Sequence, residues 1–355
     1  MRDFIIIGAG IAGLSAAARL APLGSVTVLE AEDAPGYHAS GRSAALYEPN
    51  YGARATVALN RASGAELAEA GVLSPRGLMV VATDADADTF EADRRAMKLT
   101  ELTPAEARGR LPILAPAVTR AAITEAAQDI DTDRLLQGYA RTARANGAKI
   151  RTRAGVTAIA RSAVGWQLET AAGPVAGRMI VNGAGAWADT VARMAGLAPL
   201  GIRPYRRSMA RLPAPGGRDV TGWPMVMGAG ETWYGKPDAG KWLVSPADAD
   251  PAEPHDAFAD DMVLAEGLAR YEAMVTEPVT RVETNWAGLR SYAPDRTLVI
   301  GPDPAEPAFS WLAGQGGQGF QSAAAAARLL ADRLAGRTPE FDPALVAALA
   351  PDRLR

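Results

Sequence analysis

Three glycine-rich segments are the residues of this chain best suited to hold a phosphorylated ligand. The first, Gly8 to Gly13, has the spacing Gly-x-Gly-x-x-Gly directly after a short apolar run. In such a turn the first glycine makes the tight bend and the second lets the backbone approach a pyrophosphate. The third lets the following helix pack close to the strand, and the free N–H groups at the helix start bind phosphate oxygens. The segment predicts a dinucleotide site that involves Gly8, Gly10, Ile11, Ala12 and Gly13.

An acidic residue and two later glycine segments decide which dinucleotide fits best. Glu30 follows an apolar, β-branched run at residues 25–29, 22 residues after Gly8. An acid at that point accepts hydrogen bonds from ribose hydroxyls and repels a 2′-phosphate, which disfavours NADP. The first glycine turn alone leaves NAD and FAD open. The chain returns to glycine at residues 183–185 and 314–319, and distant segments of this kind favour FAD, a long cofactor wrapped by several parts of a chain.

The composition excludes several kinds of chemistry. The chain has no cysteine and two histidines, His38 and His255, which excludes disulfides, thiol catalysis and a cysteinyl-linked cofactor. We therefore expect non-covalent FAD and no metal. A net charge of −3 with scattered basic residues gives no reason to expect nucleic acid. The absence of a signal peptide or a long apolar stretch favours a cytoplasmic protein with no membrane span.

Each glycine segment is expected to join a strand to a helix. The runs that precede them are apolar and predict buried parallel strands, at residues 4–7, 178–182 and 309–312. The runs that follow are rich in alanine and predict helices, at residues 11–22, 186–194 and 320–334. The last of these helices would direct its positive end at the flavin ring. Residues 31–52 are rich in glycine and serine and predict a functional loop that leads into a short helix.

The rest of the chain predicts a second lobe. Further strands are expected at residues 77–82, 149–159 and 166–170, a helix at 133–146, and charged peripheral helices within 84–110. Residues 200–290 are β-rich in pattern and punctuated by prolines, which indicates a separate lobe. We predict an α/β (α+β) fold of two domains. A Rossmann-type FAD-binding domain would comprise residues 1–78, 130–198 and 288–355, and a β-rich substrate-binding domain would comprise residues 79–129 and 199–287.

These residues resemble the D-amino-acid oxidase/glycine oxidase superfamily of FAD-dependent oxidoreductases. The resemblance runs nearly end to end and is carried by the glycine turn, Glu30 and the segments 40–45, 286–290 and 315–319. Within the superfamily the chain is most similar to bacterial D-arginine dehydrogenases. The resemblance implies the two-domain fold, FAD and the oxidation of an amino acid.

The resemblance also implies roles for individual residues. Arg290 would pair bidentately with the substrate carboxylate, and Arg207 would be a second carboxylate-binding or site-organising group. Tyr51 and Tyr234 would line the cavity and bind or cover that carboxylate, and Gly317 would offer its carbonyl to the amine. Met225 and Met227 are implied as further substrate contacts. Cofactor contacts are implied for Ala31, Arg42, Ser43, Ala44, Val156, Gly185, Trp187, Gly314, Gly316, Gly317, Gln318, Gly319, Phe320 and Gln321.

Three positions bear on the substrate side chain. D-Arginine dehydrogenases carry a histidine where this chain has Leu46, and a guanidinium-binding glutamate where it has Leu78. Burying a guanidinium without a counter-charge is costly, so these leucines favour an apolar side chain. Glu48 replaces a small polar residue, and if it points into the cavity it would bind an ammonium or guanidinium group. Basic substrates therefore stay open as an alternative.

The predicted reaction is the oxidative deamination of a D-amino acid with a neutral, apolar side chain. A hydride would pass from Cα to flavin N5, and the imino acid would hydrolyse to a 2-oxo acid and ammonia. Tyr51 or a water molecule would take the amine proton. The D-configuration rests on the resemblance alone, and the electron acceptor is unknown. The alternatives are an oxidase of glycine, N-methyl amino acids or 2-hydroxy acids, and a flavin-binding protein without turnover.

Overall fold

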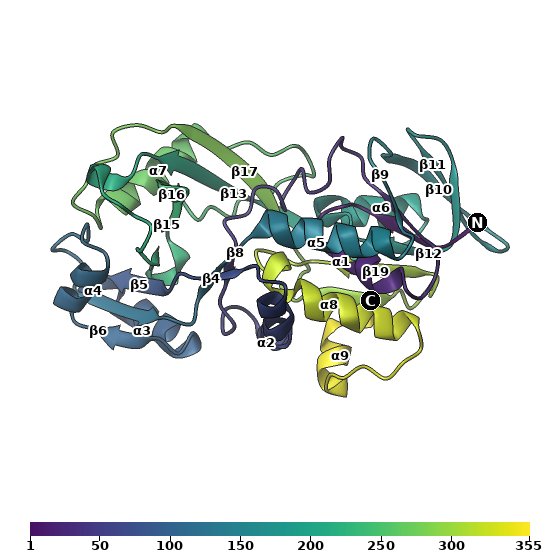
Figure 1. Cartoon of the computed structure of the whole chain (residues 1–355), viewed down its shortest axis with the longest axis horizontal. Helices are drawn as coiled ribbons and strands as arrows, with labels where there is room; N and C mark the ends of the chain where they lie inside the picture. Colours follow the sequence, from purple (N-terminus) through teal and green to yellow (C-terminus); the bar gives the residue numbers. More distant parts are fainter.

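Two large sheets organise the chain, which a computed structural model describes over residues 1–355. Figure 1 shows the sheet with α1, α5 and α8 on the right and the sheet with β5, β15 and β16 on the left. A small third sheet, whose strands β4 and β8 appear between the two in this view, has the order β3 (Leu46–Tyr47), β8 (Gln128–Ile130), β4 (Leu73–Pro75). We call the first large sheet the cofactor sheet and the second the substrate sheet.

The cofactor sheet begins with an apolar strand that is buried on both faces. Strand β1 (Arg2–Ile7) pairs in parallel with β2 (Val26–Leu29) and with β12 (Val175–Asn182). The full order is β10 (Val156–Ser162), β11 (Gly165–Thr170), β12, β1, β2 and β9 (Lys149–Arg151). The last residues of β12 also pair in parallel with β19 (Phe309–Ala313), which carries the antiparallel strand β18 (Val299–Pro302).

The three parallel strands β1, β12 and β19 bring the three glycine segments together. They end at Ile7, Asn182 and Ala313, and each is followed directly by one of the predicted glycine turns. Because parallel strands end at the same edge of a sheet, turns that lie far apart in sequence meet at one place. Ligands of open α/β sheets bind at that carboxyl edge, so this topology explains why the glycine pattern recurs.

Helices cover both faces of the cofactor sheet. One apolar core joins this sheet to α1 (Ile11–Leu20), α5 (Thr132–Ala145) and α8 (Gly319–Leu334), with α2 (Arg54–Glu69) and α9 (Pro343–Leu349) packed outside them. A second core lies on the other face, under α6 (Ala188–Met194). Helix α8 is almost wholly buried because alanines fill its central turns, and these small side chains let it lie close to α1 and α2.

The substrate sheet is mostly antiparallel. Its order is β17 (Thr284–Tyr292), β13 (Arg203–Leu212), β16 (Lys241–Ser245), β15 (Tyr234–Asp238), β14 (Met225–Gly228), β5 (Leu78–Ala82), β7 (Arg120–Thr124) and β6 (Thr100–Leu102). Strands β13 and β17 pair over nine consecutive residues. Outside it pack α3 (Ala87–Ala96), α4 (Pro104–Arg110) and α7 (Asp261–Glu272).

The predicted fold class is confirmed, and several details differ. The strand predicted at residues 149–159 is two strands, β9 and β10. The helix after the loop at residues 31–52 is α2, with 16 residues rather than a short turn. Residues 84–110 include strand β6 as well as helices. Helix α7 was not predicted among the prolines of residues 200–290; Asp260 caps it by accepting hydrogen bonds from the N–H groups of Met262 and Val263. The domain boundary predicted at residue 288 falls inside β17, and the one predicted at residue 78 falls at the start of β5. Both strands pair wholly within the substrate sheet, so residues 78 and 288–292 belong to that sheet.

Candidate functional site

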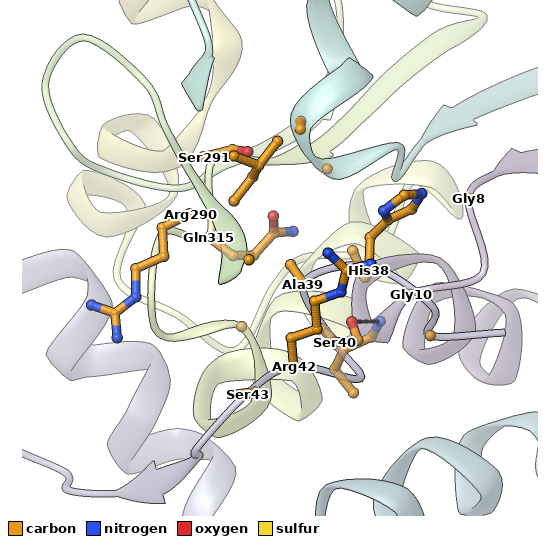
Figure 2. Close-up of a pocket in the computed structure, with 18 of the residues that line it drawn as sticks. Gly8, Gly10, His38, Ala39, Ser40, Arg42, Ser43, Arg290, Ser291 and Gln315 are labelled. Atoms are coloured by element: carbon orange, nitrogen blue, oxygen red, sulfur yellow. Dashed lines mark hydrogen bonds between the residues drawn. The ribbon is translucent and has the colours of Figure 1, made fainter. Parts of the chain in front are cut away.

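A cavity of about 550 Å³ runs from the carboxyl edge of the cofactor sheet to one face of the substrate sheet. Figure 2 shows Gly8 and Gly10 on one side of this cavity and the Arg290 guanidinium on the other. The loop residues His38 and Arg42 lie between them in the same view. The cavity is therefore long, with a glycine-lined end and an arginine-lined end.

The glycine-lined end has the features that a dinucleotide requires. Gly8 has φ of 97°, and a Cβ on it would stand 2.6 Å from the Gly183 carbonyl oxygen. The buried Glu30 carboxylate accepts hydrogen bonds from the N–H groups of Ala9, at 2.7 Å, and Glu32, at 3.0 Å. It thereby stands at the end of β2, where a ribose would lie. The first turn of α1 faces the cavity through Ile11 and Ala12, so these residues fit the pyrophosphate and adenosine parts of FAD.

The loop between β2 and β3 is held over the cavity by charged contacts. Arg42 donates to the carbonyl oxygens of Ala257, at 2.8 Å, and Ala287, at 3.0 Å, and pairs with Asp256. His38 contacts the Glu32 carboxylate at 2.8 Å. The Arg42 contacts tie this loop to two segments of the substrate sheet's half of the chain, the His38 contact lies within the loop, and Ser43 and Ala44 line the cavity.

The arginine-lined end holds a carboxylate of the protein itself. Glu231 accepts hydrogen bonds from Arg207, at 2.7 Å, and Arg290, at 3.2 Å, through one oxygen. Its other oxygen accepts a hydrogen bond from the Tyr51 hydroxyl at 2.5 Å. The second Arg290 nitrogen donates to the Tyr234 hydroxyl at 3.4 Å. We call Arg207, Arg290, Tyr51 and Tyr234 the carboxylate clamp, because the first three bind the Glu231 carboxylate and Tyr234 accepts a hydrogen bond from Arg290.

The electrostatics of the clamp leave a positive charge for a ligand. Burial on its own raises the pKa of Glu231, but Arg290 and Arg207 outweigh it and hold that pKa below its usual range. Burial also lowers the pKa of Arg290, yet Tyr234, Glu231 and Tyr51 raise it further above its ordinary value. Two arginine charges and one glutamate charge thus sum to +1, which suits a ligand with one carboxylate.

Apolar side chains surround the space beside the clamp. Leu78, Met227 and Tyr234 are between 3% and 4% exposed, and they belong to an apolar cluster against which Leu46 and Met225 pack. All five line the cavity. Leu46 and Leu78, both predicted to bear on the substrate side chain, therefore lie together on this apolar part of the cavity wall.

Most of the residues predicted from the sequence line this cavity, and three do not. Gly13 lies beneath the glycine turn, where a Cβ would stand 1.8 Å from the Gly8 carbonyl oxygen. Gln318 is turned toward Asn60, whose amide donates to it at 3.0 Å. Gly314 packs against the backbone at Ala293. These three residues shape the turns on which the cavity residues stand instead of lining the cavity themselves.

Glu231 is the functional residue that the sequence analysis missed. It lies on a short turn, Ala229–Glu231, with φ of 55°, a backbone conformation that costs a non-glycine residue about 1–2 kcal/mol. The Gly230 N–H is anchored on Asp93 at 2.7 Å. An acid beside a glycine carries no periodic signal, so only its spacing of three residues before Tyr234 could have drawn attention to it.

Replacing Glu231 by glutamine should strengthen the binding of simple carboxylates such as benzoate. The clamp would then present two positive charges without an internal counter-ion, and close charge pairs of this kind couple by about 1.5 kcal/mol or more. We expect a Kd for benzoate at least about tenfold lower, measured by titrating the flavin absorbance. The exposed Glu266→Gln is the matched control; equal affinity in both variants would contradict the clamp's charge balance.

The fold and this site define a flavoprotein oxidoreductase in which a Rossmann-type half cradles a dinucleotide and a β-rich half presents the clamp. Residues 3–333 match the family described as FAD dependent oxidoreductase, DAO. The chain belongs to that family. No group of three or more metal-binding side chains gathers anywhere in the chain, and none of its helices has the length and apolar character needed to cross a membrane.

Known proteins similar to this chain span several activities. Over 408 residues it is 28% identical to the tRNA 5-methylaminomethyl-2-thiouridine biosynthesis bifunctional protein MnmC of Delftia acidovorans, covering 99% of this chain and 61% of that protein. A segment of 72 residues, 19% of this chain and 16% of the relative, is 43% identical to D-amino acid dehydrogenase of Cereibacter sphaeroides. The chain therefore spans about three fifths of the first relative and less of the second.

A solved structure shares the fold over almost the whole length. Glycine oxidase from Geobacillus kaustophilus superposes with a TM-score of 0.83 and 23% identity, covering 97% of each chain. At that level of identity the likeness establishes the fold alone. The substrate of this chain has to be argued from its own residues.

Proposed function

We propose that this protein catalyses the FAD-dependent oxidative deamination of D-amino acids with neutral, apolar side chains. The observation that carries the proposal is the carboxylate clamp, with its two arginines, beside an apolar pocket. It lies at the far end of a cavity whose other end fits a dinucleotide. A zwitterionic amino acid matches both parts, because its carboxylate neutralises the clamp and its side chain fills the pocket. The local similarity to a D-amino acid dehydrogenase supports the same class of substrate.

The residues of the chain would bind and orient the substrate. Arg290 and Arg207 hold the carboxylate, with Tyr51 and Tyr234 as further hydrogen-bond partners, and the Gly317 carbonyl accepts a hydrogen bond from the amine. Fixing both groups sets the direction of the Cα–H bond that is to be broken, and such positioning can supply about 7–11 kcal/mol of a reaction barrier. FAD, held without a covalent bond, would accept the hydride that leaves Cα. The imino acid then hydrolyses in water.

Anaerobic flavin reduction with a panel of amino acids tests this proposal. D-Leucine, D-methionine and D-phenylalanine should bleach the flavin at rates that exceed those of their L-enantiomers, glycine, N-methylglycine and 2-hydroxy acids. Faster reduction by any of the last three would support the related oxidase instead. A flavin that no substrate bleaches would indicate a binding module without turnover. Repeating the assay with oxygen and with a dye acceptor separates oxidase from dehydrogenase.

The side-chain preference can be tested at Leu78. Replacing Leu78 by glutamate should lower kcat/KM for D-leucine and raise kcat/KM for D-arginine, shifting their ratio by at least about 100-fold. The new carboxylate would be buried without a partner unless a cationic side chain binds beside it, and an unpaired buried charge costs several kcal/mol. Leu78→Met, which conserves volume and polarity, should leave the ratio within about threefold. An unchanged ratio in the glutamate variant would place the substrate side chain elsewhere.

A further inference from the structure

The reaction proposed above requires the substrate ammonium group to lose a proton before Cα is oxidised. The cavity offers few groups at its arginine-lined end that could accept that proton. Apart from the arginines, the titratable side chains of the clamp and its bound carboxylate are Tyr51, Tyr234 and Glu231, and Glu48 lines the same cavity. Only one of these four groups is suited to take the proton, an assignment that rests on the proposed function.

Three of the four groups are already committed as hydrogen-bond partners. The Tyr51 hydroxyl donates to Glu231, and burial together with that carboxylate raises the pKa of Tyr51 above its ordinary value. Glu231 accepts from two arginines, which keep it a weak base. Tyr234 accepts a hydrogen bond from Arg290, which disfavours a further proton on its oxygen. None of them is suited to take a proton from an amine.

Glu48 differs from these groups because one of its oxygens is free. Its residue is 2% exposed, and Oε1 accepts hydrogen bonds from the Asn50 backbone N–H, at 2.9 Å, and side-chain amide, at 3.1 Å. Oε2 is buried and has no hydrogen-bond partner. A buried carboxylate oxygen without a partner is costly unless a ligand completes it. Glu48 lines the cavity, so a bound amine that reaches this covered oxygen would complete it.

The surroundings of Glu48 make it a stronger base than an exposed glutamate. Burial raises its pKa, and the Asn50 hydrogen bonds and the charge of Arg61 on α2 only partly oppose that effect. The other titratable group nearby is Tyr47, whose own pKa is raised by burial and by Glu48. From α8 the neutral Gln321 side chain faces it, accepting a hydrogen bond from the Glu48 N–H at 3.0 Å. In its ionised form, a glutamate with a raised pKa accepts a proton more readily than an exposed one.

Glu48 also lies beside the segment expected to hold the amine. The Glu48 N–H bonds to Gln321, while Asn60 bridges the Tyr51 carbonyl, at 3.1 Å, and the Gln318 side chain, at 3.0 Å. These contacts fix residues 48–51 against the start of α8. Gly317, just before that helix, contacts Arg290, since a Cβ on it would stand 3.0 Å from the guanidinium carbon. A carboxylate bound to Arg290 therefore places its α-amine near this segment.

We propose that Glu48 is the catalytic base that takes the proton from the substrate ammonium group. An N–H bond of the ammonium breaks, an O–H bond forms at the free Glu48 oxygen, and the amine is left with its lone pair. No electrons are gained or lost in this step.

The test is the pH dependence of anaerobic flavin reduction by D-leucine in the holoenzyme. The ionised form of Glu48 is the active one, so the wild-type rate should fall as the pH drops through its raised pKa. Glu48→Gln should reduce the flavin about 100-fold more slowly at pH 7, the lower range of general-base catalysis. The difference should close toward pH 10, where the free substrate amine loses its proton without help. Glu48→Asp, which keeps the carboxylate, should retain more of the rate than Glu48→Gln.

Two results would overturn the assignment. A Glu48→Gln rate reduced by the same factor at every pH would mean a purely structural role, and a loss confined to D-arginine and D-lysine would mean that Glu48 binds side chains. Exposed Glu169→Gln is the matched control and should behave as wild type.

Infrared difference spectra with 2-aminoisobutyrate, which has no Cα–H to oxidise, separate this proposal from the proposed function. A protonated-carboxyl band that appears in the wild type and is absent from Glu48→Gln supports Glu48 as the base, even if no amino acid is oxidised. If the band is absent from both proteins, the assignment of Glu48 is overturned.

Discussion

Replacing Arg290 by methionine should lower kcat/KM for the amino-acid substrate by roughly two to three orders of magnitude. Arg290 binds Glu231 and Tyr234 at the buried end of the cavity, and removing one partner of a buried charge pair costs about 2–5 kcal/mol. Most of the loss should appear in KM and in the Kd for benzoate, because methionine fills a similar volume but cannot bind a carboxylate. Flavin content should stay stoichiometric, since the glycine-lined end is untouched.

The control for this variant is Arg203→Met, at the exposed start of β13. It makes the same chemical change on a neighbouring strand and should keep kcat/KM within about twofold of the wild type. An Arg290→Met enzyme that binds benzoate as tightly as the wild type would show that the clamp does not bind carboxylates. A loss of flavin in the same variant would instead indicate that Arg290 supports the cofactor site.

Replacing Gly13 by alanine should abolish tight FAD binding. A Cβ at this position would stand 1.8 Å from the Gly8 carbonyl oxygen and 2.9 Å from its carbon, so the backbone of the turn would have to move. Overpacking of a well-packed core costs about 1–3 kcal/mol, and here the displaced atoms are those that approach the pyrophosphate. We expect the purified variant to be nearly colourless and to have a lowered Tm that added FAD does not raise.

Gly138→Ala is the matched control, because Gly138 also lies inside a helix, α5, and a Cβ there would meet only the end of the Arg141 side chain, at 3.9 Å. Removing a glycine from a helix interior stabilises it by about 1 kcal/mol, so this variant should keep its FAD and melt slightly higher. A yellow Gly13→Ala protein with stoichiometric FAD would show that the contact between turn and helix does not govern cofactor binding.

The cofactor half could be predicted from the sequence because its signals are local. The apolar run before Gly8, the glycine spacing and the acid at Glu30 lie within 30 residues, and each is dictated by the backbone of one strand–turn–helix unit. The recurrence of glycine at residues 183–185 and 314–319 indicated a shared site. The structure adds the reason, since β1, β12 and β19 are parallel neighbours that end at the same edge.

The substrate half was less predictable because its contacts join residues distant in sequence. Arg207 and Arg290 were identified through resemblance, yet the residues next to them in sequence do not indicate that both arginines bind one carboxylate. That carboxylate, Glu231, lies on a strained turn whose position depends on the packing of β14 and β15. The free oxygen of Glu48 likewise results from how residues 48–51 rest on α8, which no periodic pattern encodes.

The pairing of β13 with β17 fixes the spacing of the clamp in a way that limits how this protein can evolve. Arg207 on β13 stands opposite Gly288 on β17, and Arg290 is two residues beyond Gly288 on β17. Residues two apart on a strand point to the same face, so both guanidinium groups project from one face of the sheet. A single inserted residue in either strand would turn one arginine to the opposite face. The long connection between these strands, residues 213–283, carries no such constraint at its exposed turns. Residues can therefore be added or removed at those turns as long as Glu231, Tyr234 and the register of β13 with β17 stay in place, because these fix the carboxylate clamp.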